Sequence, residues 1–101
     1  MINTDECINY LHNNHVGREN AIAGCDLGDE FGLLAPQIRA IVNEARRNGI
    51  PICSTNKGYY YSVDPAEIKA TINGLYHRIE SVLHAIDGLE KALNAIEKQP
   101  V

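Results

Sequence analysis

The sequence predicts an α+β fold that is mostly helical, with a small N-terminal domain that contains a β-hairpin and a long C-terminal helix. Two observations lead to this prediction. A polar loop, Ser54–Gly58, separates two short runs rich in β-favouring residues, which is typical of a hairpin. After Asp64 the apolar residues recur at alternating intervals of 4 and 3 up to Ile96, as in one amphipathic helix. We expect a first domain over residues 1–63 and an oligomerisation helix over residues 64–101.

The composition is that of an ordinary soluble globular chain. Its 101 residues, 45% hydrophobic and 22% charged, suffice for one modest core. No apolar run approaches the roughly 18 residues of a membrane helix, and the N-terminus does not resemble a signal peptide. We therefore expect a cytoplasmic protein with no membrane partner. The three widely spaced cysteines are expected to be reduced, with a disulfide or a metal role as the alternatives.

Charge is distributed unevenly along the chain. The net charge of −4, taken alone, argues mildly against nucleic acid as a partner. Residues 1–35 hold 1 basic and 6 acidic side chains (net −5), residues 36–63 hold 4 and 1 (net +3), and residues 64–101 hold 4 and 6 (net −2). The basic segment is the one that contains the predicted hairpin and the helix before it.

Two short helices are expected at the start of the chain. The first runs from an N-cap at Thr4 to about Asn14. A very short strand is expected around Ile22. The second helix spans about Asp26–Phe31 and ends at Gly32, a left-handed C-cap position. The inner face of the first helix is expected to comprise Cys7, Ile8 and Leu11.

The third helix follows after a tight turn. It begins near Ala35, with Pro36 in its first turn, and it ends at Asn48-Gly49 after two arginines. Its apolar residues are spaced so that they share one side of the helix, which leaves small, polar and basic residues on the other. The inner stripe is expected to comprise Ile38, Ile41, Val42 and Ala45.

The hairpin strands are expected over Ile50–Cys53 and Tyr59–Val63, with a glycine in the loop where a positive φ is needed. Alternation along the second strand places Tyr59 and Tyr61 on one face and Tyr60 on the other. We expect one of these faces to be core, or to be covered by the long helix, rather than to stack on nucleic-acid bases.

Helix, glycine turn, helix and hairpin follow one another in the order of a winged helix–turn–helix. The residues also resemble a family. The stretch "LGDEFGLLAPQIRAIVNEARRNGIPICSTNKGYYYS" is similar to the winged helix–turn–helix of the biotin operon repressor and of many other bacterial and phage regulators. The matching features are "GL" at the turn, Ile38-Arg39, "NGIPI" and "KGYYY", over about residues 17–63. The preceding "GRENAI" is similar to small phage and prophage winged-helix proteins.

The resemblance implies a DNA-binding regulator with a recognition helix over about residues 35–48 and a wing over about residues 50–63. The chain departs from the family at three places, where Leu34 replaces an N-cap serine, Ala35-Pro36 replaces two basic residues and Gly28 replaces alanine. Direct base readout is therefore expected to be poorer than usual. By position, Ala35, Pro36, Gln37 and Arg39 would face bases, and Ala40, Asn43, Arg46, Arg47 and Lys57 would lie near the DNA backbone.

A protein-interaction or scaffold module is the alternative from another functional class, because winged helices also dock proteins. An enzyme is not expected, since the chain has no phosphate-binding glycine loop, no nucleophile elbow and no close acid pair. No cofactor or metal is expected either. The histidines are expected to be solvated surface residues rather than metal ligands; these are His12, His15, His77 and His84.

The long helix is expected to run from Pro65 to about Lys98 behind an N-cap at Asp64. Gly74 and Gly88 each cost about 1 kcal/mol in a helix interior, so the helix needs a packing partner. Its apolar stripe has a heptad pattern, with Ile72, Ile79, Ile86 and Leu93 at a and Ile68, Leu75, Val82, Leu89 and Ile96 at d.

This heptad pattern favours a two-stranded parallel coiled coil, as a tendency. The flanking positions disagree with that simple arrangement, because apolar residues broaden the stripe. An antiparallel pair, a larger bundle or a helix packed on its own domain therefore stay open, although self-association as a homodimer or higher even oligomer is preferred. The e residues are Lys69, Tyr76, Leu83, Glu90 and Glu97, and the g residues are Thr71, Arg78, Ala85 and Ala92.

Overall fold

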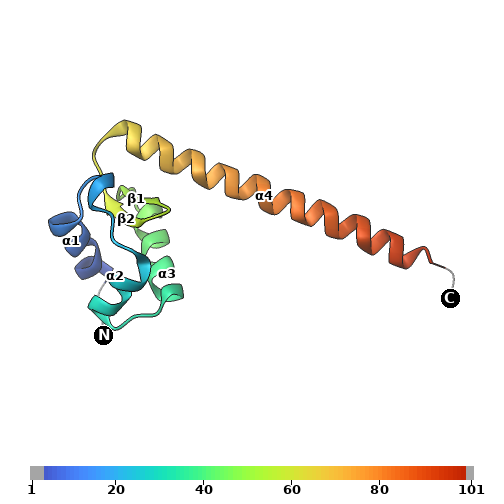
Figure 1. Ribbon diagram of the computed structural model, residues 1–101, viewed down its shortest axis with the longest axis horizontal. Helices are drawn as coiled ribbons and strands as arrows, with labels where there is room; N and C mark the ends of the chain where they lie inside the picture. Colours follow the sequence, from blue (N-terminus) through green and yellow to red (C-terminus); the bar gives the residue numbers. More distant parts are fainter. Residues whose placement is uncertain (1–3, 100–101) are drawn as a thin grey trace. The chain divides into compact units, whose positions relative to one another are not determined.

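The computed structural model describes residues 4–99, and it confirms an α+β fold that is mostly helical. A small two-stranded antiparallel sheet and a long C-terminal helix complete the architecture (Figure 1). The elements are α1 (Thr4–Asn14), the 3-10 turn η1 (Arg18–Asn20), α2 (Gly24–Phe31), α3 (Ala35–Arg47), β1 (Ile52–Thr55), β2 (Gly58–Tyr61) and α4 (Pro65–Glu97).

The chain divides into two compact units, one that extends up to Thr71 and one that begins at Ile72. The first two turns of α4 thus belong to the first unit, which extends 71 − 63 = 8 residues past the expected domain boundary. No helix in the described part of the chain combines the length and the apolar character needed to cross a membrane.

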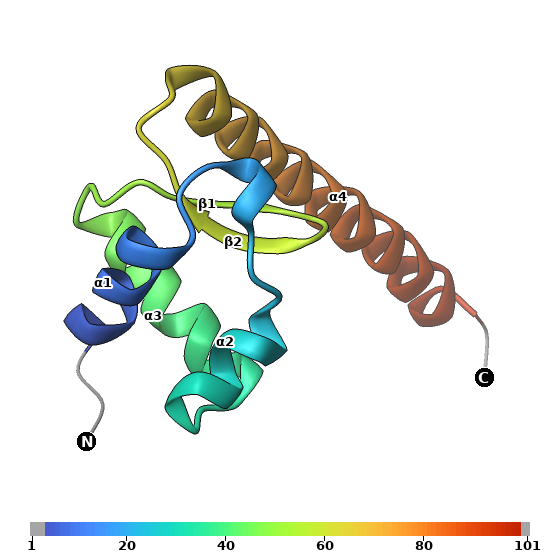
Figure 2. The same ribbon diagram turned by 60° about the vertical axis from the view of Figure 1, so that its left-hand side comes forward.

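The core of the first unit lies between α1, α2, α3 and the hairpin, as Figure 2 shows. The predicted inner faces of α1 and α3 are confirmed, with Ile41 half-buried and the other members buried. Tyr59 and Tyr61 pack against this core from β2. Its buried residues are Cys7, Ile8 and Leu11 from α1, Leu27 from α2, Ile38, Val42 and Ala45 from α3, and Ile52 from β1.

The first hairpin strand begins two residues later than the sequence predicts. The Ile50 N–H donates to the Ala45 carbonyl oxygen at 3.0 Å and so completes the end of α3, and Pro51 has no N–H to offer to a strand. Pairing starts at Ile52 opposite Tyr61 and continues to Thr55 opposite Gly58. The hairpin therefore turns through two residues, Asn56 and Lys57.

A third segment pairs with the hairpin through single residues. The N–H groups of Ile22 and Tyr59 each donate to the other residue's carbonyl oxygen at 2.8 Å, and Val16 forms a second isolated bridge with Tyr61. The strand expected around Ile22 is thus one bridge long, because α2 already begins at Gly24. These bonds hold the segment before α2 along the outer edge of β2.

Candidate nucleic-acid interface

The turn between α2 and α3 is closed by two glycines. Gly32 has φ 65° and ends α2 in the left-handed conformation, as predicted. A Cβ at Gly28 would collide with the carbonyl oxygen of Leu33, whose N–H donates to the Gly28 carbonyl at 2.8 Å. The family-typical alanine therefore does not fit at Gly28, since this turn is tighter than alanine allows.

Helix α3 has one buried and one exposed face. The exposed face contains Arg39, Asn43 and Arg47, which are spaced by four residues and so follow one another along the same side of the helix. No acidic residue lies within this row. Seven of the nine residues that the sequence proposes for DNA contact belong to α3 and are exposed; they are Ala35, Pro36, Gln37, Arg39, Ala40, Asn43 and Arg47.

The N-terminus of α3 is capped by Gln37. Its carboxamide oxygen accepts a hydrogen bond from the Leu34 N–H at 2.8 Å, which is the half of a capping box that the third helical residue supplies. Leu34 itself offers no side-chain acceptor to the N–H groups of the first turn, as a serine would. The Leu34 side chain is 72% exposed. Leu34 is thus a large exposed apolar side chain directly before the exposed face of α3.

Two of the nine proposed residues remain, Arg46 and Lys57, and Arg46 differs from the others because it is not exposed. Its side chain is half-buried, and its Nε donates to the Ile52 carbonyl oxygen at 2.8 Å. A second nitrogen, Nη2, donates to the Ser54 hydroxyl at 3.1 Å. Arg46 thus fixes the hairpin beside α3, and three of the four cations of residues 36–63 remain exposed: Arg39, Arg47 and Lys57.

The hairpin tip presents Lys57 to solvent. Its backbone N–H donates to the Thr55 hydroxyl at 3.1 Å, which shapes the turn. Gly58 follows with φ 135°, and a Cβ there would collide with the Ile22 carbonyl. The glycine that the sequence predicted for a positive φ is therefore required for a second reason, the close approach of the segment before α2.

The opposite face of the hairpin is covered by the first two turns of α4. Tyr60 and Cys53 are each 1% exposed, and Thr71 accepts a hydrogen bond from the Ser54 N–H at 3.3 Å. Burial raises the pKa of the Tyr60 phenol, and a hydrogen bond with Thr71 opposes this shift. This confirms the prediction that one tyrosine face is core or covered by the long helix; on the other face Tyr59 and Tyr61 are half-buried against the core.

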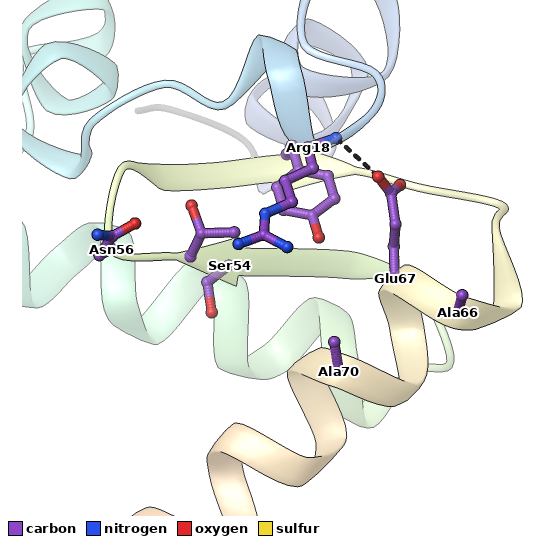
Figure 3. Close-up of a pocket in the computed structure, with 8 residues that line it drawn as sticks. Arg18, Ser54, Asn56, Ala66, Glu67 and Ala70 are labelled. Atoms are coloured by element: carbon purple, nitrogen blue, oxygen red, sulfur yellow. Dashed lines mark hydrogen bonds between the residues drawn. The ribbon is translucent and has the colours of Figure 1, made fainter.

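Glu67 is the central acceptor where η1, the hairpin and α4 meet. One carboxylate oxygen accepts from the buried Ser62 hydroxyl at 2.6 Å, and the other from the Arg18 N–H at 3.1 Å. An open pocket of about 510 Å³ lies beside it, and Figure 3 shows the Arg18 side chain between Ser54 and Glu67. The pocket lining comprises Arg18, Ser54, Thr55, Asn56, Tyr60, Ala66, Glu67 and Ala70.

The second unit, taken by itself, exposes the apolar stripe of α4. The exposed fractions run from 45% for Ile72 and Ile86 to 71% for Leu89. Of the predicted oligomerisation residues, Ile68 and Leu75 are half-buried, and all others are exposed. The exposed ones are Ile72, Ile79, Val82, Ile86, Leu89, Leu93 and Ile96.

The cysteines and histidines form no candidate reaction centre in the described residues. The three cysteines are free; Cys7 and Cys53 are buried and Cys25 is exposed. Burial raises the pKa of the Cys7 thiol. His15 is half-buried rather than solvated, with its Nδ1 at 2.8 Å from the Asn20 carbonyl oxygen. Within the part of the chain that the structure describes, no three metal-ligating side chains come together.

No protein-family model matches the chain, and neither a curated protein sequence nor a solved structure is similar enough to count as a match.

Proposed function

We propose that the chain is a DNA-binding protein of the kind found among bacterial and phage transcription regulators. In this proposal residues 4–63 form a winged helix–turn–helix, α3 is the recognition helix and the β1–β2 hairpin is the wing. The observation that supports it best is the exposed row Arg39–Asn43–Arg47, backed by a fully packed inner face and flanked by a hairpin that Arg46 holds in place.

The exposed side chains would divide into two kinds of contact. Arg39, in the N-terminal half of α3, would reach base edges, where arginine pairs with the O6 and N7 atoms of guanine. Arg47 at the helix end and Lys57 at the hairpin tip would contact phosphates, which position a protein without reading sequence. The apolar residues at the start of α3, including Leu34, suit the thymine methyl group.

Self-association through α4 belongs to the same proposal. If Arg47 and Lys57 each neutralise one phosphate, a chain has a salt slope of only about −1.8, and two chains together double it. An exposed apolar stripe that covers the length of the second unit supports a second copy as the partner of α4.

A protein-docking scaffold is the competing function, and one observation favours it. Asp26, Asp29 and Glu30 are exposed on α2, the helix that packs against α3. Their charge opposes the approach of a phosphate backbone to that side of the unit.

The deciding experiment is selection of binding sites from a pool of random-sequence DNA duplexes at two salt concentrations. Wild type is compared with Arg39→Ala, Arg47→Ala and the control Lys98→Ala, which removes an equal charge at the far end of α4. Arg46 is left intact because its loss would loosen the hairpin. Light scattering and circular dichroism confirm that each variant is folded and associated.

We expect the wild type to enrich one sequence. Arg39→Ala should cost about 1–3 kcal/mol on that sequence and relax the preference at one position. Arg47→Ala should weaken binding to all sequences alike, and Lys98→Ala should change little. A folded oligomer that binds no duplex even at low salt would overturn the proposal in favour of the scaffold.

A further inference from the structure

The direction in which two α4 helices pair can be argued from the residues along the stripe. We infer that α4 pairs with the α4 of a second copy in the antiparallel direction, with the two-fold axis near residue 84. The inference rests on the proposed self-association and adds its geometry. Its observations are the exposed a and d residues, the chemistry of the e and g residues beside them, and the ion pairs on the outer face.

The residues at the d positions do not favour a parallel two-stranded pair. In a parallel dimer d packs against d, and leucine at d with β-branched residues at a favours two strands. Of the four d residues of the second unit, two are β-branched, namely Val82 and Ile96. The pattern at a suits a parallel dimer, whereas only half of the d residues do.

The seams of a parallel pair would also be mismatched. A parallel arrangement places each g residue beside the partner's e residue five positions further along. Arg78 would then lie beside the partner's Leu83, and Ala85 beside the partner's Glu90. Each of these contacts puts a charge against an apolar side chain, and none forms an ion pair.

An antiparallel pair matches the whole stripe of the second unit. Packing a against d, with Ile72 opposite the partner's Ile96, leaves no a or d residue from 72 to 96 without a partner. A shift by one heptad would use Ile68 instead of Ile96, but Ile68 is half-buried within the first unit. The layers pair Ile72 with Ile96, Leu75 with Leu93, Ile79 with Leu89 and Val82 with Ile86, each across the axis.

The flanking residues complement one another in this register. Antiparallel helices place e beside e and g beside g, so Leu83 meets the partner's Leu83 at the axis. Lys69 comes beside the partner's Glu97, an opposite-charge pair that occurs twice by symmetry. Tyr76 comes beside the partner's Glu90, whose carboxylate can accept from the phenol. On the other seam Ala85 meets the partner's Ala85, which lets the helices approach closely, and Arg78 lies beside the partner's Ala92. This seam therefore keeps one contact between a charge and an apolar residue, as in the parallel pair.

The ion pairs already present on α4 lie away from these seams. Lys91 pairs with Asp87 at 3.1 Å, and the His77 imidazole lies 4.0 Å from Glu80, all four on the outer b and f positions. An antiparallel pair also sets the two helix dipoles in opposition, which is favourable. The stripe and the e seam therefore point to one occupant, a second α4 that runs in the opposite direction.

This direction also determines how far apart the two second units begin. Ile72 lies 12 residues from the axis, so the starts of the two second units are about 36 Å apart at about 1.5 Å per residue. A parallel pair would bring them side by side. The antiparallel dimer thus separates the two points at which the second units join the rest of their chains.

Single-cysteine cross-linking of the full chain tests the direction. The background is Cys25→Ser, because Cys25 is exposed whereas Cys7 and Cys53 are buried. Leu83→Cys brings two thiols together only in the antiparallel register, and Ile86→Cys does so only in a parallel pair, where like a residues face each other. Each variant is oxidised mildly after light scattering has measured its oligomeric state.

We expect a covalent dimer with Leu83→Cys and none with Ile86→Cys. An oligomer that cross-links through Ile86→Cys, or that fails to cross-link through Leu83→Cys, overturns the antiparallel pairing and leaves self-association intact. A protein that is monomeric at every concentration overturns both. Binding to DNA is measured separately, so that its failure is not confused with either result.

A charge swap gives a second, independent reading. Lys69→Glu should raise the dimer dissociation constant roughly threefold to tenfold, because it sets two like charges beside each other in both symmetry-related pairs. Adding Glu97→Lys to the same chain should restore the wild-type constant. If Lys69→Glu weakens the dimer and the added Glu97→Lys does not restore the dissociation constant, this register is contradicted.

Discussion

Gly58 and Gly74 show how one residue type can have opposite effects on stability at two positions. Gly58 has φ 135° and lies against the Ile22 carbonyl, so a side chain there is excluded both by the backbone conformation and by contact. Gly74 is in a helix interior with no atom within 4 Å of where a Cβ would be. It loses backbone entropy on folding and gains nothing in return.

We expect Gly58→Ala to lower the free energy of unfolding by at least about 1–3 kcal/mol, from backbone strain alone. Gly74→Ala should raise it by about 1 kcal/mol. Urea denaturation followed by circular dichroism measures both. A Gly58→Ala variant as stable as the wild type would contradict the close approach of Ile22 to the hairpin.

Arg46 and Arg47 are adjacent in the chain but differ in their surroundings. The structure engages the Arg46 guanidinium with the hairpin through Ile52 and Ser54, whereas Arg47 is exposed. Arg46 and Arg47 form one basic pair in the sequence. In the structure Arg46 stabilises the hairpin, whereas Arg47 is accessible to a ligand.

At the scale of elements, the first turns of α4 act as a cover for the hairpin. Glu67 and Thr71 bind groups on η1, on β1 and after β2, and they shield Tyr60 from solvent. The heptad pattern is continuous along α4, but the first two turns pack on the hairpin and belong to the first unit, whereas the remaining turns form the second unit. This packing explains why the first unit ends at Thr71.

We expect Glu67→Ala to lower the free energy of unfolding by about 1–3 kcal/mol, because the buried Ser62 hydroxyl and the Arg18 N–H lose their acceptor. Glu67→Gln keeps one acceptor oxygen and should lose less. The matched control is Glu80→Ala, an exposed position on the same helix that should stay within about 0.5 kcal/mol of wild type. Equal stability of Glu67→Ala and Glu80→Ala in urea denaturation would contradict this role.

For the whole molecule, the proposed function needs self-association, because a single chain offers few cations to DNA. The net charge is −4, and three cations of residues 36–63 are exposed, namely Arg39, Arg47 and Lys57. One chain therefore has little affinity for DNA, and two chains joined through α4 gain by addition.

We expect Ile79→Asp/Leu89→Asp to make the protein monomeric and to halve the salt slope of DNA binding, from about −3.6 to about −1.8. His84→Asp, which places the same charge on the outer face, should keep both the oligomer and the steeper slope. Fluorescence anisotropy across a salt series provides the measurement. An unchanged slope in the monomer would mean that each DNA contacts one chain only.

Much of the fold was predictable because it depends on local chemistry. The bounds of α1, α3 and α4, the left-handed turn at Gly32 and the glycine after the hairpin loop follow from apolar spacing, capping and glycine positions. The inner faces of the helices follow from the same spacing. These features depend on residues that are close in the sequence, so they can be predicted from the sequence alone.

Contacts between distant residues were decided by the tertiary structure alone. The hydrogen bonds of Arg46, the collision that forbids a side chain at Gly58 and the burial of Tyr60 beneath α4 involve partners or geometry that no periodicity specifies. The sequence by itself determined which elements form and which faces are apolar, because those depend on spacing. Only the packed structure decided which exposed cations stay available, because that depends on which side chains the fold brings within hydrogen-bonding distance.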